Sequence, residues 1–278
     1  MSADLHVHTT ASDGTDGPEE VVCRAKILGL KAIAVTDHDT VDGVEPALAA
    51  GRLSDIEVVT GVELGAQYLG KELHLLGYSI DTDNYILKDK LSFLIGERKS
   101  RIFKMVQKVQ NLGIPVSCEE VLAVSRSGSV GRPHLATVLI KAGVVNNITE
   151  AFNKYIGFGC PAYVPRYKLH PVEAINIINK AGGVSVLAHP GQNNAHELLD
   201  MLMNAGLAGL EVYHPAHSRE QEYFYFSLAR EHGLIITGGS DYHGHGHKTG
   251  NHLGSVTVPY GSVKEIVKKK WYNNGRKT

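Results

Sequence analysis

The sequence predicts an α/β protein built around a closed barrel of parallel strands, with a helical segment inserted into it. Three observations support this fold class. Seven short runs are rich in Val, Ile, Leu and Ala, as expected of parallel strands that are buried on both faces. Helical patterns separate many of these runs, in the strand, helix, strand order that is typical of parallel sheets. The regularity is interrupted between residues 81 and 160, where the chain is poor in strands and rich in helices.

The predicted elements follow in order on either side of this interruption. A helix is expected to start at Pro18, because proline suits the first turn, and to be capped at its end by Gly29. The other helices of the barrel are predicted at about 43–51, 171–181, 195–205 and 218–232. The strands are predicted at 3–8, 31–36, 56–64, 73–80, 183–188, 208–213 and 234–238.

The insertion divides the chain into a barrel domain, residues 1–80 and 161–278, and a helical domain, residues 81–160. Apolar residues at helical spacing predict helices at 85–112, 119–126, 133–142 and 149–156. The first of these helices carries more cations than its acids can balance. The cations either form a solvated helix face or, as a group beside a site, favour an anionic substrate. They are Lys88, Lys90, Arg98, Lys99, Arg101, Lys104 and Lys108.

Composition places the chain among ordinary globular proteins. Of its 278 residues, 43% are hydrophobic and 21% are charged, which argues against a disordered or fibrous protein. The formal net charge of −1 disfavours binding to long tracts of nucleic acid, DNA included. No apolar run approaches the length of a membrane span and no signal peptide is recognisable, so we expect a cytoplasmic protein without membrane association. The three cysteines are widely spaced and suggest neither disulfides nor a thiolate zinc site.

The first predicted strand places two histidines on one face. Alternate residues of a strand point the same way, so His6 and His8 should share one side. Leu5 and Val7 should share the other. Two parallel imidazoles can hold one metal ion, and Asp13 in the following loop could reach towards a second. Taken alone, the segment is equally compatible with a half-buried strand that carries two solvated histidines.

Ionisable residues occur near the same end of nearly every predicted strand. In parallel barrels the loops after the strands gather at one rim, where functional groups collect. So many ionisable groups at one rim would be costly without cations to neutralise the carboxylates. The residues concerned are His6, His8, Asp13, Asp37, His38, Asp39, Glu63, His74, His189, Glu211, His214, Asp241 and His243.

The ligand types limit the metal. Imidazole and carboxylate groups without thiolates suit Zn, Mn or Fe, and their number exceeds the coordination sphere of one ion. We therefore expect two or three divalent ions, with Glu63 as the candidate bridging ligand.

Six segments together resemble the PHP (polymerase and histidinol phosphatase) family of metal-dependent phosphoesterases. They occur in the family's order and span the barrel: DLHVHTTASDG, AVTDHDT, GVEL, LLGY after His74, LAHPG and GSDYHG. The resemblance implies a distorted seven-stranded (β/α) barrel, similar to a TIM barrel, with a trinuclear metal site. Asp13 stands where some relatives have histidine, so the site that includes it is the less certain to be filled. The implied ligands are His6, His8, Glu63 and Asp241 for the first ion, Asp13, His38 and His243 for the second, and Glu63, His74 and His189 for the third.

The insertion resembles the subgroup of 3′,5′-nucleotide bisphosphate phosphatases and 5′-end-directed RNA exonucleases. The resemblance rests on RKSRIFKM, GRPHLATVLIKAG and AFNKYIGFGCPAYVP. It implies a substrate-binding cap in which Arg132 and His134 hold a substrate phosphate, for which arginine has a well-matched fork of donors. The sequence alone also allows a simple helix start, with Pro133 in the first turn and His134 as a local cap.

The expected activity is hydrolysis of a nucleotide phosphomonoester by a metal-bound hydroxide. The expected substrate is the 3′-phosphate of a nucleoside 3′,5′-bisphosphate, and a short 5′-phosphorylated RNA is a longer substrate for the same site. His214 is a candidate to protonate the leaving group or to contact phosphate. Asp37 is a candidate acceptor that orients a ligand imidazole.

Two alternatives remain open from the sequence. A histidinol-phosphate phosphatase would apply the same chemistry to a smaller substrate, although the cationic insertion fits two phosphates better. A noncatalytic metal-binding PHP module, of the kind attached to polymerases, conflicts with the full ligand set and with the lack of a polymerase segment in this sequence. No obligate protein partner is indicated.

Overall fold

The computed structural model describes residues 1–125, 130–247 and 249–275. It divides into two compact units, which we call unit 1 (Met1–Lys90 and Lys168–Thr278) and unit 2 (Leu91–Tyr167). These boundaries lie later in the chain than those expected after residues 80 and 160. The first boundary falls inside helix α3 (Tyr85–Asn111), which begins in unit 1 and continues in unit 2, so the start of the helix does not mark the start of a domain.

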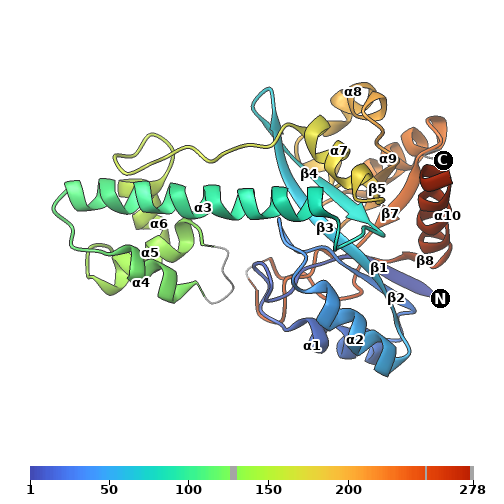
Figure 1. The fold of residues 1–278 in the computed structure, drawn as a ribbon, viewed down its shortest axis with the longest axis horizontal. Helices are drawn as coiled ribbons and strands as arrows, with labels where there is room; N and C mark the ends of the chain where they lie inside the picture. Colours follow the sequence, from blue (N-terminus) through green and yellow to red (C-terminus); the bar gives the residue numbers. More distant parts are fainter. Residues whose placement is uncertain (126–129, 248, 276–278) are drawn as a thin grey trace. The chain divides into compact units, whose positions relative to one another are not determined.

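Unit 1 is built on one eight-stranded sheet that forms a nearly closed barrel (Figure 1). The strand order is β7-β6-β5-β4-β3-β2-β1-β8. The backbone N–H of His8 donates to the carbonyl of Tyr242 at 2.8 Å, which joins the end of β1 to the segment after β7. The predicted α/β barrel is therefore confirmed. The strands are β1 (Ser2–Val7), β2 (Ala32–Val35), β3 (Glu57–Tyr68), β4 (Lys71–Tyr78), β5 (Val184–Leu187), β6 (Gly209–Tyr213), β7 (Ile235–Gly238) and β8 (Val258–Pro259).

Strand β4 departs from the expected parallel arrangement, because it runs antiparallel to both β3 and β5. A two-residue loop joins β3 to β4, and both loop residues, Leu69 and Gly70, have positive φ angles, of 48° and 80°. Two consecutive positive φ angles give the turn whose twist matches a β-hairpin. The short strand β8 also pairs antiparallel, with β1, and its two residues are too few to form a recognisable apolar run.

Strand β1 is irregular between Asp4 and Val7, where its register with β2 shifts. Leu5 lies in the buried cluster inside the barrel, whereas Val7 packs in the cluster that includes residues of α1 and α2. The expectation that Leu5 and Val7 share one side is therefore wrong. An irregularity of this kind interrupts the alternation of side chains. The first residues of the strand therefore pack in the core, and its last residues lie at the rim of the barrel.

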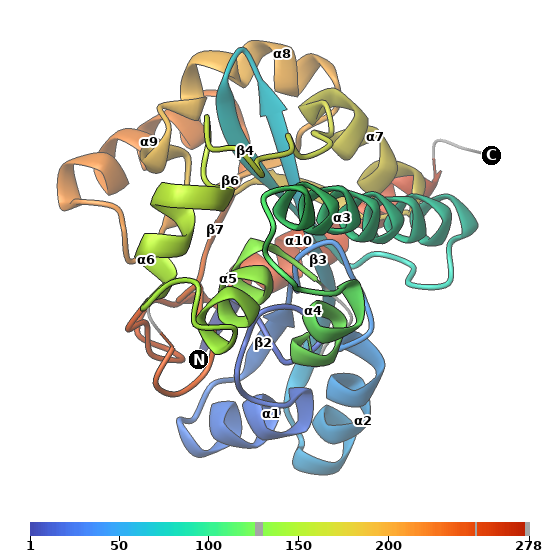
Figure 2. The same ribbon diagram turned by 90° about the vertical axis from the view of Figure 1, so that its left-hand side faces the viewer.

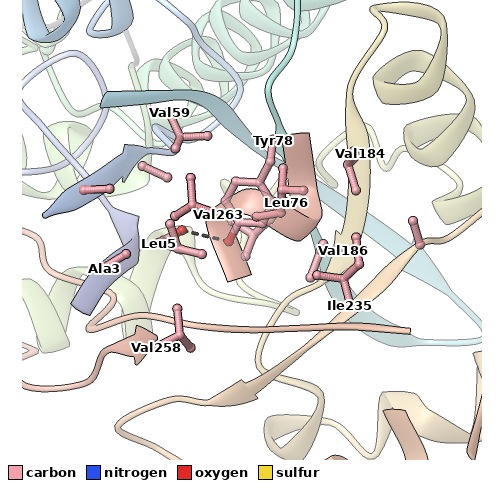
Figure 3. Close-up of a cluster of buried hydrophobic side chains, with 14 of the residues drawn as sticks. Ala3, Leu5, Val59, Leu76, Tyr78, Val184, Val186, Ile235, Val258 and Val263 are labelled. Atoms are coloured by element: carbon pink, nitrogen blue, oxygen red, sulfur yellow. Dashed lines mark hydrogen bonds between the residues drawn. The ribbon is translucent and has the colours of Figure 1, made fainter. Parts of the chain in front are cut away.

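The barrel interior is filled by small and medium aliphatic side chains from several strands (Figure 3). Ala3 and Leu5 of β1 meet Val184 and Val186 of β5 across this core. Tyr78 of β4 is one of the largest fully buried side chains, and its hydroxyl donates to the Leu5 carbonyl at 2.7 Å. A buried hydroxyl needs such a partner, since an unpaired polar group in the core is destabilising.

Helices surround the sheet of unit 1. Helices α1 and α2 lie side by side next to β2 and β3 (Figures 1 and 2). Gly29, which follows α1, has a φ of 75°, as expected for a glycine just after a helix end. The helices are α1 (Pro18–Ile27), α2 (Val44–Ser54), α7 (Pro171–Lys180), α8 (Leu199–Asn204), α9 (Arg219–Glu231) and α10 (Gly261–Gly275), with short 3₁₀ turns at Pro190–Gln192 and Ala195–Leu198.

Unit 2 has a core of its own, formed by apolar residues from all of its helices, such as Met105, Leu135 and Leu139. The predicted helix at 119–126 corresponds to α4, and residue 126 lies outside the described residues. Within the described part of the chain, no helix has the length and apolarity that a membrane crossing requires. The elements of unit 2 are the later part of α3, α4 (Cys118–Val124), α5 (Arg132–Lys141), α6 (Ile148–Ala151) and a π-helical turn at Phe152–Ile156.

We predict that Tyr78→Phe lowers the free energy of unfolding by about 1–2 kcal/mol, because it removes a buried hydrogen bond without removing the ring. Urea denaturation followed by circular dichroism measures this change. Tyr85→Phe is the matched control, since Tyr85 is exposed at the start of α3. An equal stability of the Tyr78→Phe and Tyr85→Phe variants would show that the Tyr78 hydroxyl does not stabilise the barrel.

Candidate metal centre

The predicted ligands of unit 1 converge at one rim of the barrel. His6 lies on β1 and His8 directly follows it, and their ring centres are 5.1 Å apart, so the two imidazoles do lie together as expected. His74 lies near the start of β4, whereas the other predicted ligands lie near or after the ends of their strands. The antiparallel direction of β4 explains this difference, because His74 pairs with Gly65, just beyond Glu63 on β3. The start of β4 therefore reaches the same rim as the ends of the parallel strands.

Glu63 is at the centre of the site, and its two carboxylate oxygens face five imidazoles. Its Oε2 lies 3.2 Å from a ring nitrogen of each of His6, His8 and His38. Its Oε1 lies 2.7 Å from Nδ1 of His74 and 3.2 Å from Nε2 of His189. The carboxylate of Glu63 thus lies between two groups of imidazoles, one at each oxygen. A ligand that bridges two metal ions needs this geometry.

Two further carboxylates complete the cluster. Asp241 follows β7, and its Oδ1 lies 3.4 Å from His6 Nε2 and 3.3 Å from His8 Nε2. Asp13 lies in the loop after β1, and its Oδ1 is 3.4 Å from His243 Nε2. The structure therefore brings together all nine residues that were expected to bind metal.

The charges of the site suit divalent cations. Burial alone would raise the pKa of Glu63, but the surrounding imidazoles, His38 and His74 foremost, hold it well below its ordinary value. Burial also acts to raise the pKa of Asp241, and His6 is the main group that lowers it instead. Both groups are therefore carboxylates near neutral pH. Burial lowers the pKa of His38 and of His243 to about 4, which leaves these imidazoles neutral and able to act as ligands.

His8 differs from these two histidines. Burial opposes a charge on its ring, but the Asp241 and Glu63 carboxylates raise its pKa to about 10. The carboxylates that favour a proton on His8 would equally favour a divalent cation beside it. Both ring nitrogens of His8, and Nδ1 of His74, are buried without a well-formed hydrogen bond. Buried polar atoms normally have a partner, so these orphaned nitrogens fit a metal centre.

Ligating atoms fall into overlapping groups that are close enough to share an ion. His38 belongs to two of these groups, one with Asp13 and His243 and one with Glu63 and His74. Three of the four members of the expected first set, His6, His8 and Asp241, form another of these groups, which does not include Glu63. The donor set contains only nitrogen and oxygen ligands, which fits Zn, Mn or Fe and disfavours thiolate chemistry.

Asp37 contacts the loop after β1 rather than an imidazole. Its Oδ1 accepts from the backbone N–H of Thr9 at 2.8 Å, and its Oδ2 accepts from the Thr9 hydroxyl at 2.7 Å. The hydroxyl of Ser12 also donates to Asp37, at 2.5 Å. These bonds differ from the expected role of orienting a ligand imidazole. They hold in place the loop that carries Asp13.

Glu211 contributes to the site although it was absent from the predicted ligand set. It lies on β6 and is fully buried. Its Oε1 lies 2.9 Å from His6 Nδ1, and its Oε2 accepts from the backbone N–H of His189 at 2.7 Å. The sequence indicated that Glu211 lies at the rim, because it is near a strand end. Only its contacts in the structure show that it supports other residues and is not itself a metal ligand.

His214 is held in one tautomer by its own loop. The backbone N–H of Ala216 donates to Nδ1 of His214 at 3.1 Å, so this nitrogen carries a lone pair. In the neutral ring the proton must then be on Nε2, which lies 3.4 Å from Oδ2 of Asp241. A protonated Nε2 at the rim suits a hydrogen-bond or proton donor better than a metal ligand.

Arg132 and His134 lie in unit 2, at the first turn of α5. The guanidinium of Arg132 lies over the ring of Phe152, 4.9 Å from its centre. Nδ1 of His134 accepts from the backbone N–H of Gly131 at 3.0 Å, which is the local cap considered above. The cap does not conflict with phosphate binding, because it leaves Nε2 of His134 as the protonated nitrogen.

Several cations of α3 have local partners. Within unit 1, Lys88 and Lys90 each pair with a carboxylate at 2.6 Å, and within unit 2 two others donate to backbone carbonyls. These four therefore stabilise the protein locally. The pairs are Lys88 with Asp83, Lys90 with Glu173, Arg101 with the carbonyl of Val164, and Lys108 with the carbonyl of Tyr163.

Comparison with known proteins agrees with this geometry. Residues 4–96 match the family model described as the PHP domain. The chain is 32% identical to the 5′-3′ exoribonuclease Rnm of Escherichia coli, over 86% of this chain and 84% of that protein. It is 31% identical to a 3′,5′-nucleoside bisphosphate phosphatase of Chromobacterium violaceum, over 87% of each chain. It is also 30% identical to a phosphoribosyl 1,2-cyclic phosphate 1,2-diphosphodiesterase of Eggerthella lenta, over 88% of this chain and 95% of that one.

A solved structure extends the similarity to the whole fold. The crystal structure of a protein from Bifidobacterium adolescentis, assigned as a metal-dependent phosphoesterase, is 33% identical, with a TM-score of 0.82 and 95% of each chain covered. The chain belongs to the PHP family. It is a metal-dependent phosphoesterase, a hydrolase that acts on ester bonds. This class excludes the noncatalytic module considered from the sequence.

We predict that Glu63→Gln reduces the number of bound divalent ions by more than one per chain, because Glu63 faces both groups of imidazoles. Asp13→Asn, which alters one group only, should remove at most one. Metal analysis after removal of ions with chelator and reloading with Mn²⁺ or Zn²⁺ measures both numbers. If Glu63→Gln retains the wild-type number of ions, Glu63 is not a bridging ligand.

Proposed function

We propose that the chain hydrolyses the 3′-phosphate of a nucleoside 3′,5′-bisphosphate, and that a short RNA with a 5′-phosphate is a longer substrate for the same site. The observation that supports this most directly is the central position of Glu63, whose two oxygens face five imidazoles. An arrangement with two or three ions, of Mn, Fe or Zn, suits a phosphoryl group, because several positive charges can contact its oxygens at once.

Three ligand sets are proposed for these ions, and they share one carboxylate, that of Glu63. When bound, the ions would lower the pKa of water at the site and stabilise the negative charge of the transferring phosphoryl group. The proposed sets are His6, His8, Glu63 and Asp241; Asp13, His38 and His243; and Glu63, His74 and His189.

His214 is proposed to contact the phosphate by donating a hydrogen bond from Nε2 to an oxygen of the reacting ester, rather than to protonate the leaving group. The Ala216 amide supports this role, since it occupies Nδ1 and leaves Nε2 as the donor. Oδ2 of Asp241 lies 3.4 Å from Nε2 on this side of the ring. In this neutral tautomer Nε2 acts as a hydrogen-bond donor, because loss of the only ring proton would leave an imidazolate.

Unit 2 is proposed to be the substrate-binding domain. Arg132 and His134 would hold the phosphate that is not cleaved, with the arginine fork and the Nε2 of His134 as donors. A substrate with two phosphates then gains affinity from both units, whereas a monophosphate gains it from the metal centre only. The first turn of a helix adds a favourable partial positive charge for an anion.

We expect the enzyme to prefer adenosine 3′,5′-bisphosphate to adenosine 3′-monophosphate and to histidinol phosphate when phosphate release is measured with Mn²⁺. Arg132→Ala should lower kcat/KM for the bisphosphate by about 10- to 100-fold, as expected for loss of a charge-assisted hydrogen bond, and leave the monophosphate nearly unchanged. Lys141→Ala, at the exposed end of the same helix, is the matched control.

Other outcomes of this assay would point to other substrates. Preference for histidinol phosphate without an effect of Arg132→Ala would overturn the nucleotide assignment and leave the metal centre intact. Preference for a ribose 1,2-cyclic phosphate would indicate a diesterase such as the Eggerthella relative. A 5′-phosphorylated RNA pentamer, included in the same assay, measures the exonuclease activity beside the phosphatase activity.

We predict that His214→Gln lowers kcat by about 100-fold, within the range that one positioned hydrogen-bond donor to the reacting group contributes. The bound metal should remain at the wild-type level, because His214 is not a proposed ligand. His232→Gln, an exposed histidine at the end of α9, is the control. A kcat within threefold of the wild type, or a loss of metal in His214→Gln, would contradict the proposed role.

A further inference from the structure

We propose that Glu211 is a positioning residue that fixes the tautomer of His6 and the main-chain conformation of His189. The proposal rests on the ion-binding roles proposed above for these two histidines. It assigns Glu211 a supporting function, although its carboxylate is close enough to His6 and His214 to be counted with them as a candidate metal group.

The contacts of Glu211 explain why it is not itself a ligand. Its carboxylate is fully buried on β6 and cannot be satisfied by solvent. Oε1 is taken by His6 Nδ1 at 2.9 Å, and Oε2 is taken by the His189 amide at 2.7 Å. Both oxygens therefore already have a donor, and the carboxylate links the end of β1 to the segment after β5.

The first of these bonds selects the ring nitrogen that His6 presents to the metal centre. Oε2 of Glu211 accepts from the His189 amide, and a carboxylate in its usual ionised form can only accept at Oε1 as well. His6 Nδ1 must therefore carry a proton. In the neutral ring that a metal ligand requires, the lone pair is then on Nε2, the nitrogen that faces Glu63 and Asp241 at 3.2 and 3.4 Å.

The second bond holds an unusual backbone conformation. His189 has a φ of 26° and a ψ of 56°, a left-handed conformation that residues other than glycine rarely adopt. Its amide donates to Glu211, and its side chain turns to place Nε2 3.2 Å from Oε1 of Glu63. Glu211 therefore supports two of the proposed ligands, which lie on opposite sides of Glu63.

The substitution Glu211→Gln tests this arrangement with little change of shape. The backbone amide of His189 can only donate, so the oxygen of the new side chain must stay opposite it. The amide nitrogen then faces His6 Nδ1 as a donor, and His6 can pair with it only by moving its own proton to Nε2. A single atom exchange should thus turn the metal-facing nitrogen of His6 from an acceptor into a donor.

The experiment measures metal affinity and imidazole tautomers, and it does not depend on any substrate. Zn²⁺ is titrated into chelator-treated wild type and Glu211→Gln, and ¹⁵N-histidine spectra of the Zn²⁺-loaded proteins report which ring nitrogen is protonated. His6 signals are identified by their absence in His6→Gln. We expect the wild type to have a proton on Nδ1 of His6, and Glu211→Gln to lose this signal and to bind Zn²⁺ about 10- to 100-fold more weakly.

Asp4→Asn is the matched control, because Asp4 is another fully buried carboxylate near the rim that contacts no ring nitrogen. It accepts from the backbone and hydroxyl of Ser240 and from the Gly254 amide. Asp4→Asn should keep the proton on Nδ1 of His6. If Glu211→Gln does not fold, Glu211→Asp is used instead, because it keeps an ionised acceptor. Glu211→Asp should also keep the proton on Nδ1 of His6. Loss of this proton in Glu211→Asp would refute the proposal.

The remaining outcomes separate this inference from the proposed function. If Glu211→Gln keeps the Nδ1 proton and binds Zn²⁺ within twofold of the wild type, Glu211 does not position His6. If the wild type binds no divalent ion, the proposed function fails, and the spectra of the unloaded proteins still decide whether Glu211 sets the state of His6. If Asp4→Asn and Glu211→Gln lose the Nδ1 proton of His6 and the affinity for Zn²⁺ to the same extent, the losses reflect general destabilisation, and the proposal is refuted.

Discussion

The buried charge of Glu63 is the constraint on which the rim of the barrel depends. A carboxylate that is removed from water needs compensating charge or hydrogen bonds, and here five imidazoles approach its two oxygens. These imidazoles come from β1, the segments after β2 and β5, and the start of β4. The sheet brings these segments together, so the site depends on the barrel.

Three further buried carboxylates, those of Asp4, Asp37 and Glu211, hold the proposed metal ligands in position. Asp4 fixes the segment around Ser240 that leads to Asp241, and Asp37 fixes the loop that carries Asp13. Glu211 links the two sides of the centre. Each of these groups accepts mainly from backbone amides or hydroxyls, so its own charge is satisfied without a cation. The ligands are therefore attached to a preorganised frame, which limits the reorganisation that ion binding requires.

The two units contribute different chemistry. Unit 1 concentrates carboxylates and imidazoles, which suit cations, whereas unit 2 presents Arg132 at a helix start, which suits an anion. The proposed preference for a nucleoside bisphosphate rests on these two different chemistries. Four of the cations of α3 are engaged in local contacts, so the proposed phosphate site consists of Arg132 and His134 and does not depend on the overall charge of that helix.

By itself, the sequence determined the class of fold and predicted the residues that lie together at the rim of the barrel. Continuous apolar runs indicate buried strands, because a strand buried on both faces has apolar side chains on both. Ionisable residues at the ends of parallel strands lie together, because these ends form one rim of the barrel. Only the tertiary structure decided the direction of β4, the different environments of Leu5 and Val7, the partners of Asp37 and the place of Glu211 among supporting groups. These features depend on backbone angles at Leu69 and Gly70, on one register shift in β1 and on distances between strands far apart in sequence. Residue types and their spacing do not specify such quantities, because they are set when the strands pack against one another.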